Sequence, residues 1–252
     1  LESVTIPESV TEIGDYAFFD CRKLTAITIP NSVTSIGKEA FNSCESLKDI
    51  TIPKSVRTIK SRTFIHCESL ETVVITKGVK TIGECAFSNC HSLESVTIPE
   101  SVTLIGTDAF SYCKSLKSIT IPKSVKEIKT GAFGECRSLE SIVISKGVTM
   151  IGEHTFHACT SLQSVTIPEG VTMISRHAFE GCTGLQEVVI PEGVTSIGER
   201  AFKDCTSLAS VTIPESVTEI VRYAFSGCKS VESIVVAEGN PVYDSRAGCN
   251  AI

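Results

Sequence analysis

The sequence predicts an α/β repeat protein, a solenoid built from stacked units of 23 residues. Leucine or valine opens each unit from Leu1 to Val231, phenylalanine recurs at the same interval from Phe18 to Phe225, and a cysteine follows each phenylalanine three residues later. No insertion or deletion interrupts this period. A fixed period of about 20 to 50 residues is typical of arrays in which each unit packs only against its neighbours.

Each unit is expected to begin with a β-strand, as its first copy illustrates. Apolar and polar residues alternate here, so Val4 and Ile6 should point inward while Ser3 and Thr5 point outward. Pro7 follows and ends the strand. Because the units are stacked, the strands of successive copies should pair in parallel.

A short second strand and a short helical segment are expected to complete the unit. Val10 and Ile13 form a second buried pair, and Ala17, Phe18 and Cys21 then lie at helical spacing on one face. The unit therefore alternates a strand, a turn, a short strand and a short helix.

The array should form one elongated domain over residues 1–252, with ten regular units in residues 1–230 and a divergent unit in 231–252. The chain starts at the first core position of a unit, without a signal peptide, and we expect it to be part of a longer protein. A net charge of −6 argues against nucleic-acid or membrane-surface binding. No apolar run approaches the roughly 20 residues needed to cross a bilayer.

The repeated motif I-P-x-S-V-T-x-I-G-x-x-A-F-x-x-C-x-S-L resembles the BspA-like (Treponema-type) leucine-rich repeats of bacterial surface proteins. Its opening L-x-x-V-x-I is similar to the strand signature of leucine-rich repeats in general. The resemblance implies a leucine-rich-repeat solenoid on the bacterial cell surface or secreted. It also implies a non-catalytic module, without a cofactor, that binds a host or matrix protein or a glycan. A structural spacer that projects another domain from the cell is the alternative.

Two outward surfaces are the candidates for binding. Serine and threonine dominate the outward face of the first strands, and lysine or arginine gathers on the turns that follow these strands in units three to seven. An anionic partner would suit the basic turns, although a solvated edge without a partner has the same composition. The candidate binding residues are Lys54, Arg57, Lys77, Lys80, Lys123, Lys126, Lys146, Thr97, Thr120 and Thr166. Beside them, an apolar trio of Leu104, Met150 and Met173 is a second possible contact patch.

Histidine provides one compact polar group. His154 and His177 occupy the same position in adjacent units, and His157 and Glu180 follow one turn later. The four side chains should form a square that could hold Zn²⁺ or Ni²⁺, which leaves a metal-dependent enzyme as a third functional class. An ordinary solvated face explains the same residues, so no metal site is assigned.

The repeating cysteines are expected to be reduced and buried, because each one fills a small apolar position between a core phenylalanine and the next core leucine. Disulfides between neighbouring units and metal binding are the alternatives. Cys85 stands at an outward position and is expected to be the most exposed thiol, with Cys249 as a second one.

Overall fold

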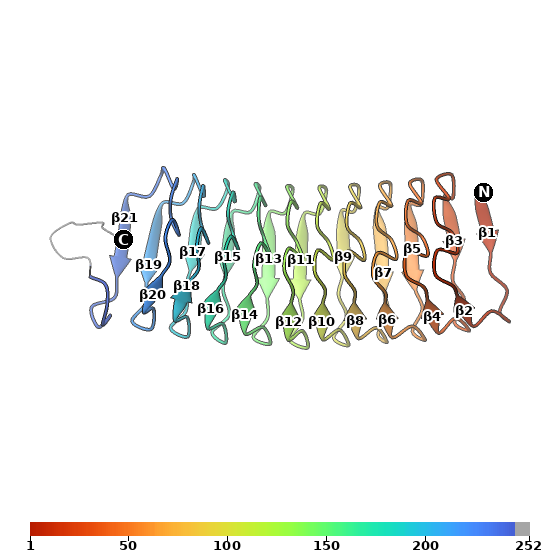
Figure 1. The fold of residues 1–252 in the computed structure, drawn as a ribbon, viewed down its shortest axis with the longest axis horizontal. Coiled ribbons are helices and arrows are strands. Elements are labelled where there is room, and N and C mark those ends of the chain that lie inside the picture. Colours follow the sequence, from red (N-terminus) through yellow and green to blue (C-terminus); the bar gives the residue numbers. More distant parts are fainter. Residues whose placement is uncertain (245–252) are drawn as a thin grey trace.

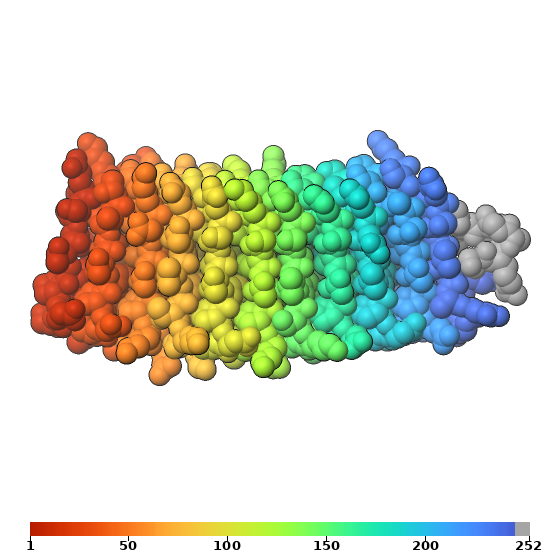
Figure 2. Space-filling model, turned by 180° about the vertical axis from the view of Figure 1, so that it is seen from behind, coloured from red at the N-terminus to blue at the C-terminus, as the bar shows by residue number. Residues whose placement is uncertain are grey.

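The computed structural model describes residues 1–244, which form an elongated solenoid with one turn of the chain for each 23-residue unit (Figure 1). The units follow one another along the long axis in sequence order (Figure 1). In the space-filling view they appear as adjacent bands that run across the molecule (Figure 2). The predicted parallel-strand solenoid is therefore confirmed.

The first strand of each unit pairs in parallel with the first strand of the next, at an offset of 23 residues. Ser118 pairs with Ser141, for example, and Ile121 pairs with Ile144. The hydrogen-bonded ladder runs without a break from β5 to β17. These strands are β1 (Ser3–Thr5), β3 (Ala26–Thr28), β5 (Asp49–Ile52), β7 (Thr72–Ile75), β9 (Ser95–Thr97), β11 (Ser118–Ile121), β13 (Ser141–Ile144), β15 (Ser164–Thr166), β17 (Glu187–Val189), β19 (Ser210–Ile213) and β21 (Ser233–Val236).

The second strand of each unit is two residues long and also pairs in parallel, as Met150 does with Met173. Its second residue points into the core and its first points outward. These strands are β2 (Glu12–Ile13), β4 (Ser35–Ile36), β6 (Thr58–Ile59), β8 (Thr81–Ile82), β10 (Leu104–Ile105), β12 (Glu127–Ile128), β14 (Met150–Ile151), β16 (Met173–Ile174), β18 (Ser196–Ile197) and β20 (Glu219–Ile220).

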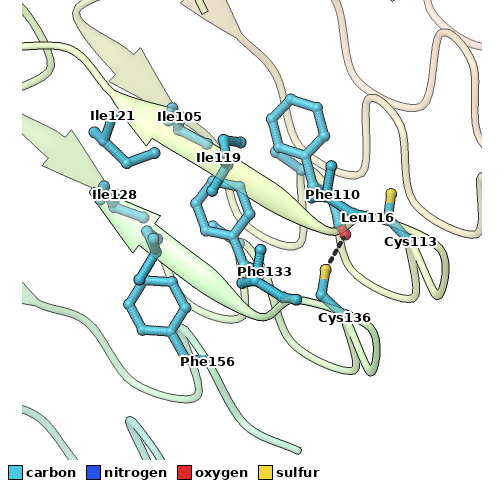
Figure 3. Close-up of a cluster of buried hydrophobic side chains, with 14 of the residues drawn as sticks. Ile105, Phe110, Cys113, Leu116, Ile119, Ile121, Ile128, Phe133, Cys136 and Phe156 are labelled. Atoms are coloured by element: carbon cyan, nitrogen blue, oxygen red, sulfur yellow. Dashed lines mark hydrogen bonds between the residues drawn. The ribbon is translucent and has the colours of Figure 1, made fainter. Parts of the chain in front are cut away.

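The core is a stack of identical layers, one for each unit. Phenylalanine rings lie face to face along the axis; Phe133 is 5.5 Å from Phe110 and 5.8 Å from Phe156 between ring centroids, and all three are fully buried (Figure 3). Leucine and the inward strand residues surround this ring column, as Leu116 and Ile119 do (Figure 3). The phenylalanines are therefore the largest side chains removed from water.

The cysteines form a second column beside the phenylalanines. From Cys44 onward, each thiol of this column donates a hydrogen bond to the backbone carbonyl of the phenylalanine in the preceding unit, and Cys136 Sγ lies 3.2 Å from Phe110 O (Figure 3). The same bond recurs from Cys44 to Cys228 at 3.1 to 3.3 Å. The described cysteines are all free thiols. Each of these cysteines thus fills an apolar position and adds a second donor to a carbonyl that also accepts a backbone amide of its own unit.

The segment after the second strand is a chain of turns, so the predicted short helix is not found within residues 1–244. In unit five, successive backbone amides alternate between two kinds of acceptor. The amides of Ala109, Ser111 and Cys113 donate to the carbonyl three residues earlier in the same unit. The amides of Asp108 and Phe110 donate to backbone carbonyls of the next unit. An α-helix would direct every amide to the carbonyl four residues earlier. The helical spacing in the sequence reflects these three-residue turns.

Two positions in each of these turn segments have a positive φ, which an α-helix excludes. They are columns that run along the array, one from Tyr16 to Tyr223 and the other from Asp20 to Gly227. Most of these residues are not glycine, at φ between 50° and 62°. A left-handed conformation costs a non-glycine residue about 1–2 kcal/mol. The stacking bonds to the next unit hold the backbone in it.

Exchanging alanine and glycine at neighbouring positions of one column tests this backbone strain. Gly181 has φ 74°, and an added Cβ would meet Ala158 Cα at 3.6 Å, an ordinary contact. Gly181→Ala should therefore lower the free energy of unfolding by about 0.5–1 kcal/mol, through conformation alone. Ala158→Gly, at φ 55°, should raise it by a similar amount. Urea unfolding measures both; a destabilising Ala158→Gly would contradict the assigned backbone.

In the divergent last unit, β21 pairs with β19 of the preceding unit. Beyond β21, side chains form hydrogen bonds to the backbone of that preceding unit. Asn240 Nδ2 donates to the carbonyls of Pro214 and Val217, at 2.8 and 2.9 Å. Tyr243 Oη accepts a hydrogen bond from the amide of Ile220 at 2.9 Å. The last regular unit is therefore covered in part by polar side chains of residues 231–244.

Candidate functional site

The first-strand face is the broadest candidate surface, and strand alternation positions its side chains. Thr97, Thr120 and Thr166 are exposed on β9, β11 and β15, above the buried residues that precede them in each strand. Val143 and Val189 stand in the same outward row and are 58% and 51% exposed. The face therefore mixes hydroxyl groups with isolated apolar side chains.

A hollow of about 370 Å³ brings two of the candidate threonines together. Thr97 and Thr120 line it together with Ser95, Ser118 and Glu100. Thr166 is not among its lining residues. The hydroxyls and one carboxylate give the hollow several hydrogen-bonding groups and a negative charge. Glu100 was not among the predicted site residues, although its place beside the outward threonines could have been read from the repeat.

The charged ridge is the row of turns that joins the first strand to the second in each unit. It carries seven exposed basic candidates, and Glu100 interrupts them at the position of Lys77 and Lys123. Lys146 Nζ lies 2.9 Å from Glu169 Oε2, where the ridge turns acidic, and Arg57 Nη1 donates to Gly78 O at 3.3 Å. The predicted basic residues are Lys54, Arg57, Lys77, Lys80, Lys123, Lys126 and Lys146.

The four predicted residues of the histidine square do lie together. The rings of His154 and His177 stack at 4.6 Å between centroids, and His157 stands edge-on to His154 at 5.5 Å. His177 Nδ1 contacts Glu180 Oε2, and the other oxygen of Glu180 accepts a hydrogen bond from Lys203 at 2.9 Å. Both carboxylate oxygens of Glu180 are thus engaged by protein cations or donors.

Burial and the neighbouring charged or hydrogen-bonding side chains shift the pKa values of His154 and Glu180. Burial lowers the pKa of His154, and the neighbouring His177, His157 and Arg176 lower it further. Burial alone would raise the pKa of Glu180, but its hydrogen bonds with Lys203 and His177 outweigh burial and leave that pKa lowered. Within residues 1–244 no group of three or more histidine, cysteine or acidic residues is arranged to hold a metal ion.

Cys85 is one of three described cysteines that are only partly buried. It is only half-buried, but Cys21 and Cys228, in the first and last regular units, are also half-buried. Burial raises the pKa of the Cys85 thiol, and the nearby Asp108 and Glu84 raise it further. Cys85 is therefore one of three partly exposed thiols among the described residues, its being the most exposed of them stays a prediction, and Cys249 lies outside the described residues.

Three comparisons relate this chain to known proteins. The family model described as the BspA type leucine rich repeat region matches in six copies, at residues 1–117, 81–206 and 172–247. The comparison with curated proteins gave no match. Among residues 1–244, no helix is both long and apolar enough to cross a membrane.

Solved structures of bacterial leucine-rich repeat proteins resemble the chain. A T. pallidum leucine rich repeat protein is 33% identical, with a TM-score of 0.60, over 64% of this chain and 78% of that one. A leucine-rich repeat protein of Eubacterium ventriosum has a TM-score of 0.53 at 20% identity, over 92% and 84%. One from Bacteroides ovatus is 29% identical, with a TM-score of 0.49, over 98% and 85%.

Proposed function

Because the chain belongs to the BspA-type leucine-rich repeat family, we propose that it is a non-catalytic binding module of a bacterial surface or secreted protein. Its partner is a host or matrix protein or a glycan, and the interaction serves recognition or adhesion. Leucine-rich-repeat solenoids are in general scaffolds that present an extended surface to a partner. No enzyme family is indicated by the comparisons.

The observation that carries this proposal is the hydroxyl-lined hollow on the first-strand face. A spacer needs only stacked units, and nothing in stacking requires a polar depression there. Thr97 and Thr120 present hydroxyl groups that donate and accept hydrogen bonds, and Val143 offers an apolar contact one strand away. This combination suits the amides of a protein or the hydroxyls of a glycan, with each unit contributing a weak contact that adds to the others.

The charged ridge supports a second mode of recognition, of an anionic partner such as a sulfated glycan. Lys54, Lys77, Lys123 and Lys146 are exposed in one row, so their side chains can reach a long polyanion together. Lysine ammonium groups attract sulfate and carboxylate through charge, and such attraction weakens as salt increases. Capture through this row should therefore depend steeply on ionic strength.

Two substituted proteins test the binding surfaces. Lys54, Lys77, Lys123 and Lys146→Glu should reduce capture of a sulfated glycan by at least about tenfold, because the row reverses its charge. Thr97, Thr120 and Thr166→Lys should abolish binding through the strand face, because long charged side chains cover the hollow. All seven positions are exposed, so the fold should remain. Surface plasmon resonance against host matrix proteins and sulfated glycans measures both effects.

A matched control separates the ridge from net charge. Lys23, Lys48, Lys114 and Lys229 are exposed outside the ridge, and their replacement by glutamate changes the net charge equally. This control should bind as the parent does. If both test variants bind like the parent, or the parent captures none of these ligands, the spacer is the better account of the chain.

A further inference from the structure

The charged ridge changes from mainly basic to acidic between units seven and eight. At the equivalent position of each unit, lysine predominates in units four to seven, and glutamate occupies units eight to eleven. At the boundary Lys146 and Glu169 form an ion pair of 2.9 Å. All these side chains are exposed: Lys77, Glu100, Lys123 and Lys146, then Glu169, Glu192, Glu215 and Glu238.

An apolar pair occupies the same two units as this boundary. Met150 of β14 pairs with Met173 of β16, and the two residues are 43% and 38% exposed. At this position the flanking units carry the polar residues Glu127 and Ser196, and Leu104 of unit five is a further apolar residue. The boundary between basic and acidic halves is thus marked by adjacent exposed methionines.

We propose that a second copy of this chain docks antiparallel on the charged ridge, related by a two-fold axis that passes between units seven and eight. The axis lies in the interface and perpendicular to the long axis of the array. Unit seven of one copy then faces unit eight of the other, six faces nine, and four faces eleven. Such an interface is isologous, because each copy uses the same surface.

Charge complementarity selects this arrangement. Lys146 faces Glu169 of the second copy, Lys123 faces Glu192, and Lys77 faces Glu238. Each contact occurs twice by symmetry. Only Glu100, which faces Glu215, meets a like charge. A parallel arrangement of the two arrays would instead place each lysine against its own counterpart and each glutamate against its own. Electrostatic repulsion therefore disfavours the parallel form.

The centre of the interface is apolar. Met150 of one copy faces Met173 of the other across the axis, so the exposed pair becomes a cluster of four methionine side chains. Methionine is enriched in interface cores because its flexible thioether adapts to irregular surfaces. Lys123 and Glu192 have no ion-pair partner within residues 1–244, so both are available to the second copy.

The interface is narrow, and the dimer should be weak. Units four to eleven extend over about 35 Å at the spacing of paired strands. A strip of this length and of the width of one turn buries about 1,000 Å² in total, near the lower limit for a specific interface. Its ion pairs are solvent-exposed and are screened by salt. A sulfated glycan bound to the same lysines and a second copy would exclude one another.

Sedimentation equilibrium of the chain with exchanged charges tests the proposal. At about 20 mM salt the parent should form dimers at about 100 µM and dissociate at about 500 mM salt. Lys123→Glu or Glu192→Lys alone should raise the dissociation constant about tenfold, because two attractive contacts become repulsive. The double variant Lys123→Glu, Glu192→Lys should restore dimerisation, because it re-creates opposite charges across the axis.

Further variants examine the apolar centre and the fold. Met150→Lys with Met173→Lys should abolish the dimer, whereas Lys48→Glu, outside the ridge, should leave it unchanged. Circular dichroism of each variant confirms that the array is folded. A parent that stays monomeric at low salt up to about 500 µM would overturn the proposal, as would a double charge exchange that fails to restore the dimer.

Discussion

Phe133→Ala is expected to lower the free energy of unfolding by about 3–5 kcal/mol, because it removes a fully buried ring from the middle of the ring column. The loss combines apolar burial with the cavity that remains. The flanking rings of Phe110 and Phe156, at 5.5 and 5.8 Å, are fixed by their own units and cannot close the gap completely. Each unit is stabilised mainly by contacts with its two neighbours, so unfolding should begin at the unit that has lost its ring.

The measurement is urea unfolding followed by circular dichroism, with Phe19→Ala as the matched control. Phe19 is the same residue type but is 49% exposed, so its replacement should cost less than about 1 kcal/mol. Hydrogen exchange of the amides of units five to seven would locate the opening. Equal losses for Phe133→Ala and Phe19→Ala would show that the ring column does not carry the stability assigned to it.

Alkaline pH is expected to unfold the array steeply, because its fully buried thiols cannot ionise in place. Burial raises the pKa of Cys136 and Cys182 from 9.0 to about 12, and Cys67 and Cys113 are raised well above 9.0 for the same reason. The thiols of the unfolded chain lose their protons near the ordinary value. Stability is therefore complete below about pH 9 and falls as the pH rises toward the folded-state pKa.

The steepness is the distinctive part of this prediction. One such thiol lowers stability by about 1.4 kcal/mol per pH unit, so the eight buried thiols together lower it by at most about 11 kcal/mol per pH unit. Urea unfolding at several pH values between about 8 and 11 measures the slope. A variant with Cys113→Ala and Cys136→Ala should start less stable but lose stability about one quarter less steeply. An unchanged slope would contradict the thiol origin.

The layered core could be predicted from the sequence because it repeats. Phe133, Cys136 and Leu139 recur at one spacing through the regular units, with Val231 in place of the last leucine, and the stacking of similar layers leaves few alternatives for where they point. The outward threonines were predictable for the same reason, since alternation fixes the two faces of a strand. Their exposure on β9, β11 and β15 agrees with this prediction.

The turn segment was not predictable from apolar spacing, because residues three apart lie on one face both in a helix and in these turns. The sequence does carry a weaker signal. Asp20, His66, Asn89, Gly181 and Gly227 share one column, and these residue types are enriched at positive φ. Read down the column, they indicate a left-handed position that a helix could not contain.

The geometry of the candidate sites could be predicted only in part from the repeat pattern. The histidine square was expected from register, and the four side chains are indeed adjacent, but the engagement of Glu180 by Lys203 depends on the neighbouring unit and on rotamers. The hollow beside Thr97 and Thr120 likewise depends on how neighbouring side chains pack, which no periodic pattern specifies.

Because successive regular units are bonded to one another in the same way, each unit adds the same length to the protein. Every regular unit offers the next one the same strand register, the same thiol-to-carbonyl bond and the same ring contact. A whole unit can therefore be removed or duplicated without creating a new kind of junction. Each such change would alter the reach of the molecule by about 5 Å, the spacing of paired strands. Recombination between near-identical units can thus adjust length in fixed steps while the fold remains the same.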